Sequence, residues 1–156
     1  MSTQNKMKLY LLSYLLLLIP FSDVFYATVI GIADGDSIII LTCDNKQLKI
    51  RLEGIDCPEP DQDFGKKAKE ATTALCFKKN VRIVKSGVDC YGRTLAFVYV
   101  GDLCVNNELL SQGMAWHYTK YNHDSTMMKL ETNARSMKIG LWSLPDPTPP
   151  WDFRHK

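Results

Sequence analysis

The chain has 156 residues, of which 46% are hydrophobic and 23% are charged, as is typical of one compact domain. This composition excludes a disordered chain, a collagen and a long coiled coil. Lysine and arginine (19) exceed aspartate and glutamate (17) by so little that the formal net charge is +2, so a nucleic-acid partner would have to be recognised by local clusters of charge.

The N-terminal segment combines two early lysines with an apolar run, Leu9–Phe21. This run is about 13 residues long, whereas a helix needs about 20 residues to cross a bilayer. A basic start, a short apolar core and a small residue at Ala27 predict a signal peptide over residues 1–27, and therefore an exported protein, periplasmic or secreted. The alternative is an uncleaved membrane anchor through residues 9–21.

The remaining chain is predicted to form one domain, residues 28–143, followed by an extended proline-rich tail, residues 144–156. The expected elements are strands at 28–32, 37–42 and 47–55, a helix at 66–79, strands at 81–85 and 94–100, and helices at 105–112 and from 125 to Gly140, the last one capped by Asp124. Five short strands, with helices after the third and fifth, predict an α+β fold that is mainly β. The expected architecture is a five-stranded OB-type Greek-key barrel with three helices.

The five cysteines contain no C-x-x-C pair, and the three histidines lack the spacing of zinc ligands, so no structural zinc site is expected. In an oxidising compartment one or two disulfides are expected, which leaves an odd number of thiols unpaired. The pairing among Cys43, Cys57, Cys76, Cys90 and Cys104 cannot be read from the sequence.

Polar residues gather in three predicted turns, at 34–37, 51–59 and 89–93. Carboxylates on short turns can converge on a hard cation, and arginines can hold a phosphate by two-point contact. Each turn alone also has an ordinary interpretation, because Asp-Gly-Asp is most often a plain turn and a strand arginine is usually solvated. The order and separation of the three turns together indicate a phosphoryl-transfer site.

In chain order the sequence reads DGDS, IRLEGIDCPE, FG before a helix, DCYGRTLAFV, VNNELLSQGMAW and ARSMKIGLW. This series resembles the micrococcal nuclease (thermonuclease) family over residues 28–143, and the tail PTPPWDFR resembles the ending of exported bacterial members. The resemblance implies an OB barrel with three helices. It also implies a monomeric, calcium-dependent nuclease that acts on DNA and RNA, prefers single-stranded or denatured substrates, and cuts the 5′ P–O bond to leave 3′-phosphates.

The resemblance implies a calcium site. Asp36 and Asp56 match the family's calcium-ligating aspartates. Cys57 occupies a position whose backbone carbonyl also ligates calcium, and a backbone ligand tolerates the change of side chain. Asp34 is expected to act on the cation indirectly, through water.

The resemblance also implies the residues that act on the substrate. Glu59 matches the general base that activates the attacking water. Arg51 and Arg93 match the arginines that clamp the phosphate and stabilise the charge of the transition state. Tyr91 matches a tyrosine that contacts phosphate.

Three departures from the family pattern limit what the resemblance implies. Asp61 and Asp63 stand where the type member has lysines, in a shortened stretch before the first helix, which predicts weaker or more salt-sensitive binding of nucleic acid. In the family, two aromatic residues stack on the nucleoside, and this chain matches them poorly. Tyr121 is the better match, and Tyr118 is a candidate whose position in the sequence is shifted relative to the family pattern. Trp116 is expected in the core.

Two further hypotheses follow. A bridge between Cys57 and Cys90 would connect two of the polar turns and preorganise the site. The alternative function is an OB-type module that binds single-stranded nucleic acid without cutting it. A nuclease is favoured, because a competent residue occupies each matched catalytic position.

Overall fold

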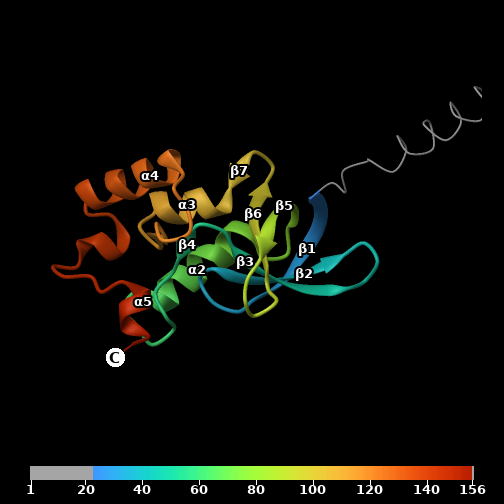
Figure 1. The fold of residues 1–156 in the computed structure, drawn as a ribbon, viewed down its shortest axis with the longest axis horizontal. Coiled ribbons are helices and arrows are strands. Elements are labelled where there is room, and N and C mark those ends of the chain that lie inside the picture. The colour runs from blue at the N-terminus through green and yellow to red at the C-terminus, as the bar shows by residue number, and fades with distance from the viewer. Residues whose placement is uncertain (1–22, 156) are drawn as a thin grey trace, which may run out of the picture.

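The computed structural model describes residues 23–155, and its centre is a closed β-barrel (Figure 1). The barrel strands are β1 (Val24–Ile32), β2 (Ser37–Thr42), β3 (Gln47–Leu52), β5 (Asn80–Val88) and β6 (Thr94–Val100). β1 pairs antiparallel with β2 and β5, β2 with β3, and β5 with β6. A parallel pairing of β3 with β6 closes the barrel, so the predicted five-stranded OB-type barrel is confirmed.

The helices lie on one side of the barrel and pack against one another (Figure 1). The three predicted helices are present as α2 (Gly65–Cys76), α3 (Val105–Ser111) and α4 (Ser125–Ser136), and the Asp124 carboxylate caps α4 by accepting from the amides of Thr126 and Met127. Two predicted boundaries are wrong. The first helix ends at Cys76 rather than at residue 79, and α4 ends before Gly140, because Lys138 adopts a left-handed conformation with φ 53°.

The tail also differs from the predicted extended chain. A short 3₁₀ helix, η1 (Gly140–Ser143), leads into it, and a fourth α-helix within the described residues, α5 (Pro150–Phe153), ends it. Proline suits the first position of a helix, because its missing amide would have no partner there. Figure 1 shows α5 beside the beginning of α2, close to the mouth of the barrel.

The core is formed by the inward-facing residues of the strands together with apolar residues of the helices. Its largest fully buried side chains include Ile38, Ile40, Ile50, Leu52, Ile83, Leu109, Leu110 and Met127. A second cluster joins Trp116, Ala134, Leu141 and Trp142, with Trp151 packed against it. Trp116 is 7% exposed and its ring centroid lies 4.4 Å from that of Trp142, which confirms the expected core role.

Two short pairings place polar residues at one mouth of the barrel. β4 (Ile55–Asp56) pairs with β8 (Trp116–His117), so Asp56 lies opposite Trp116. Ser37 pairs with Arg51 across β2 and β3, and the Leu52 amide donates to the carbonyl of Asp36. The beginning of β2 and the end of β3 therefore meet at this mouth, and β4 follows directly after β3.

A further two-residue strand, β7 (Leu103–Cys104), pairs with β6.

β1 begins at Val24, earlier than the predicted Thr28. Residues 24–27 pair with β5, and Ala27 is buried opposite Val81. Residues 1–22, which hold most of the predicted signal peptide and the alternative anchor, lie outside the described residues. Within residues 23–155, no helix is both long and apolar enough to span a membrane.

Gly35 is predicted to be required for close packing of the β1–β2 turn. A Cβ atom at Gly35 would lie 2.7 Å from Cys57 Cβ and 2.9 Å from Ala68 Cβ. Gly35→Ala should therefore lower the free energy of unfolding by about 1–3 kcal/mol, measured by urea denaturation. Gly87→Ala is the matched control, because the nearest atom to a Cβ there is 4.0 Å away. Equal stability of the two variants would contradict the packing argument.

Candidate active site

Two buried carboxylates share one arginine at the mouth of the barrel. Arg51 Nη2 donates to Asp56 Oδ1 at 2.9 Å and lies 3.1 Å from Asp36 Oδ2. Arg51 Nη1 donates to the carbonyls of Leu52 and Ile55, which fixes the guanidinium against the turn between β3 and β4. Asp36 is 6% exposed and Asp56 is 1% exposed, so these charges lie in a region largely closed to water.

The environment of Asp36 opposes its negative charge. Burial raises the pKa of Asp36 to about 7, and the nearby carboxylates of Asp34 and Asp56 add to this effect. Arg51 and the amide of Cys57, which donates to Asp36 Oδ2 at 2.7 Å, act in the opposite direction. Because burial is the largest of these effects, the pKa of Asp36 stays raised although Arg51 lies close to it.

A second arginine, from the tail, reaches the same carboxylates. Arg154 follows α5, and its Nη2 donates to Asp56 Oδ2 at 2.8 Å. Its Nη1 donates to Glu59 Oε1 at 2.6 Å and to Asp56 Oδ1 at 3.3 Å. These hydrogen bonds to Asp56 and Glu59 raise the pKa of Arg154, although burial acts to lower it. Arg154 therefore links the buried Asp56 to the more accessible Glu59.

The turn between β5 and β6 holds the second predicted arginine. Arg93 Nε donates to Asp89 Oδ2 at 2.6 Å, while Asp89 Oδ1 accepts from the amides of Tyr91 and Arg93. Although burial acts to raise it, these hydrogen bonds lower the pKa of Asp89. The Arg93 guanidinium lies over the ring of Tyr91, which is 80% exposed. Arg93 is thus preorganised by its own turn and does not pair with Asp36 or Asp56.

One cleft of about 950 Å³ brings the predicted site residues together. Its lining includes Asp34, Asp36, Arg51, Asp56, Cys57, Glu59, Tyr91, Arg93, Tyr118 and Tyr121. The lining also includes three residues of the tail that sequence reasoning missed, Trp151, Arg154 and His155. The motif PTPPWDFR resembles the ending of exported family members, but it assigns no function to the tail. No local sequence pattern indicates that the tail folds back onto the barrel.

The aromatic residues of the cleft form a chain. Tyr118 and Tyr121 meet edge to face with ring centroids 5.0 Å apart. Trp151 also stacks on Tyr118. Their ring centroids are 5.2 Å apart and the two rings are only 8° from parallel. Tyr121, which is 66% exposed, leaves more of its ring open to a ligand than Tyr118 does.

The oxygen donors of the site suit a hard cation. Asp36 and Asp56 each place an oxygen within 3.1 Å of the same Arg51 nitrogen, and their excess negative charge favours a cation between them. Among residues 23–155, no three His, Cys, Asp or Glu side chains are grouped to hold a metal ion. Carboxylate oxygens such as those of Asp36 and Asp56 are the ligand type that a hard cation prefers.

All five cysteines are free thiols, so the expected bridge between Cys57 and Cys90 is wrong in this structure. The reason is their placement. Cys57 is buried beneath the site and its environment raises the pKa of its thiol, chiefly through burial. Cys90 is exposed in the turn between β5 and β6. The site is held together by ion pairs and hydrogen bonds instead.

Comparison with known proteins places this arrangement in a family. The family model described as "Staphylococcal nuclease homologue" matches residues 49–144. A protein of Haemophilus influenzae named "Uncharacterized endonuclease" is 43% identical over 128 residues, covering 82% of this chain and 72% of the relative. The "Micrococcal nuclease" of Shigella flexneri is 36% identical over 141 residues, covering 83% and 80% of the two chains.

A similar "Uncharacterized endonuclease" of Escherichia coli is 39% identical over 132 residues, covering 84% of this chain and 86% of the relative. The barrel, the cleft and these matches define the class of the protein, a nuclease that hydrolyses phosphodiesters. The chain belongs to the staphylococcal nuclease family.

Asp36 should make stability depend on pH. Because the pKa of Asp36 is raised to about 7, the native state binds its proton more tightly than the unfolded chain does. The resulting stabilisation is complete below about pH 4 and is lost as the pH rises through about 7. In the presence of chelator, Asp36→Asn should therefore gain stability relative to wild type between pH 5 and pH 8, by up to a few kcal/mol, since one pKa unit corresponds to about 1.4 kcal/mol.

The measurement is the urea midpoint of both proteins at pH 5, 6.5 and 8. Glu70→Gln, a change on the exposed face of α2, is the control and should follow wild type. If the difference between Asp36→Asn and wild type were the same at all three pH values, the raised pKa of Asp36 would be wrong.

Proposed function

We propose that this nuclease requires calcium and hydrolyses DNA and RNA at the 5′ P–O bond, leaving 3′-phosphates. The observation that carries the proposal is the buried pair Asp36 and Asp56, which lies in one cleft with Glu59, Arg51 and Arg93. The pair supplies only oxygen ligands, and calcium accepts irregular oxygen cages, whereas magnesium demands near-octahedral geometry.

Each side chain has a distinct task in the proposed reaction. When bound, the calcium ion supplies polarisation of the phosphodiester. Glu59, half-buried at the edge of the cleft, removes the proton from the attacking water. Arg51 and Arg93 then hold the phosphate oxygens, and their interaction strengthens as negative charge grows on those oxygens. The bond to the 5′ oxygen breaks as the new bond from water to phosphorus forms.

The nucleic acid is proposed to bind along the exposed aromatic residues of the cleft. Tyr91 contacts a phosphate, and Tyr121, supported by Tyr118, stacks on a base. Stacking needs an unpaired base, so single-stranded or denatured DNA is the preferred substrate. The protein is proposed to act as a monomer.

Glu59→Gln should separate chemistry from binding. The substitution keeps the shape of the side chain but removes its basicity, so turnover of denatured DNA under saturating calcium should fall by about 10²- to 10⁴-fold. Binding of DNA in chelator should be little changed. Glu70→Gln is the matched control, because its side chain lies outside the cleft. Cleavage by Glu59→Gln at the wild-type rate would show that Glu59 is not the general base.

The metal requirement is tested with the same assay. Cleavage of denatured DNA should stop in excess chelator, return with calcium and remain low with magnesium. Full activity in chelator, or equal activity with magnesium, would contradict the calcium assignment. Binding of DNA without cleavage in any metal would support the alternative of an OB-type binding module.

We also propose that the protein is exported. A cut after Ala27, as the sequence predicts, would remove four residues of β1 and their pairing with β5. We therefore propose that processing falls before Val24, which keeps the barrel intact. Mass spectrometry of the mature protein from the periplasm or medium should give an N-terminus at or before residue 24. An N-terminus near Thr28 would contradict this boundary, and unprocessed protein in membranes would favour the anchor.

A further inference from the structure

Arg154 occupies the oxygen atoms that the proposed cation needs. The carboxylate of Asp56 is 1% exposed, and both of its oxygens accept hydrogen bonds from guanidinium groups, Oδ1 from Arg51 and Oδ2 from Arg154. The other end of the Arg154 guanidinium donates to Glu59 Oε1 at 2.6 Å. Arg154 thus neutralises both the buried carboxylate and the proposed general base.

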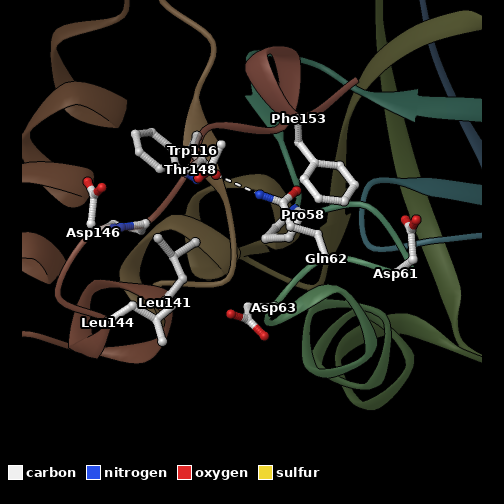
Figure 2. A pocket seen from close by; sticks show the side chains of 11 residues that line it. Pro58, Asp61, Gln62, Asp63, Trp116, Leu141, Leu144, Asp146, Thr148 and Phe153 are labelled. Carbon is white, nitrogen blue, oxygen red and sulfur yellow. Dashed lines mark hydrogen bonds between the residues drawn. The ribbon is translucent and has the colours of Figure 1, made fainter. Parts of the chain in front are cut away.

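The position of Arg154 is determined by an ordered tail. Trp151 stacks on Tyr118 and also meets the edge of Trp116, at 5.6 Å between ring centroids. Before α5, the carbonyl of Thr148 accepts a hydrogen bond of 2.6 Å from Gln62 Nε2, drawn as the dashed line in Figure 2. The same figure shows that Phe153 lies beside the loop that carries Gln62. These contacts attach the tail to Gln62 after Glu59 and to the aromatic residues Trp116 and Tyr118, so the position of Arg154 is restricted.

The charges of the site explain why a tethered cation is stable there. Asp34, Asp36, Asp56 and Glu59 all line the cleft, whereas Arg93 is paired with Asp89. Among the described residues, Arg51 forms ion pairs with Asp36 and Asp56, and Arg154 forms ion pairs with Asp56 and Glu59. A divalent cation bound to Asp56 would add two positive charges at the oxygens that the Arg154 guanidinium already contacts, and like charges at such short distances repel.

We propose that Arg154 is a built-in competitor of the divalent cation, which must displace this guanidinium from Asp56 and Glu59 before the site can act. The inference rests on the proposed function, since it assumes that a cation binds at these carboxylates. The tail then sets the cation concentration at which the nuclease becomes active. The coupling is reciprocal. The factor by which Arg154 weakens binding of the cation equals the factor by which the cation weakens binding of Arg154 to the carboxylates.

Calcium affinity tests the proposal without nucleic acid. Isothermal titration calorimetry of calcium should show tighter binding to Arg154→Gln than to wild type by about tenfold, within the usual range of coupling between two ligands. Arg82→Gln is the matched control. It also removes one positive charge, but from a side chain that packs on the ring of Tyr99, outside the cleft. Arg82→Gln should bind calcium within about twofold of wild type.

Arg154→Lys is a second variant that tests the same contact with a smaller change to the tail. It keeps the charge but loses the two-point contact with Asp56, so its calcium affinity should lie between those of wild type and Arg154→Gln. Thermal unfolding checks that all variants are folded. Equal or weaker calcium binding by Arg154→Gln overturns the proposal, as does the same gain of affinity in Arg82→Gln.

The two proposals fail in different ways. If wild type binds calcium and cuts DNA but Arg154→Gln binds no more tightly, only the competition is wrong. If neither protein binds calcium while both cut DNA in chelator, the calcium site itself is wrong, and the competition is overturned with it.

Discussion

The ion pairs between Arg51 and the carboxylates of Asp36 and Asp56 hold the candidate site together. Each carboxylate comes from a different segment, Asp36 from the turn after β1 and Asp56 from β4, and Arg51 stands near the end of β3 between them. Burying two carboxylates costs free energy that a single guanidinium does not fully offset. Burial is the main cause of the raised pKa of Asp36, which reflects that cost. The barrel thus keeps two buried carboxylates next to one arginine of its strands.

The remaining charge is balanced by a segment far away in the sequence. Arg154 is separated from Asp56 by most of the domain, yet its guanidinium contacts both oxygens of that carboxylate. Aromatic stacking of Trp151 and the hydrogen bond from Gln62 position it, so the packing of the tail and the electrostatics of the site are coupled. The structure shows the form neutralised by the tail, and the proposed competition implies a second form in which a metal ion takes the place of Arg154.

The sequence predicts the barrel and most of the cleft for identifiable reasons. The alternation of Leu48, Ile50 and Leu52 with charged residues marks a half-buried strand, and Asp124 marks the start of a helix. The resemblance then assigns the site residues, and the structure brings Asp36, Asp56, Glu59 and both arginines of that assignment to one cleft.

What the sequence does not predict depends on tertiary contacts. The tail is rich in proline and favours extended structure locally, but packing of Trp151 and burial of Pro150 turn its end into α5. Similarly, adjacent motifs suggest a bridge between Cys57 and Cys90, whereas both are free thiols, the first buried and the second exposed. The pairing of Arg154 with Glu59 has no signal in the local sequence, since 95 residues separate the two.

The most direct test of the account is the position of calcium in a crystal structure of the protein grown with that ion. Anomalous scattering measured at long wavelength distinguishes calcium from water. The account predicts a calcium ion with carboxylate oxygens of Asp36 and Asp56 among its ligands. A calcium ion bound elsewhere, with Asp36 and Asp56 still paired only to arginines at saturating calcium, would contradict it.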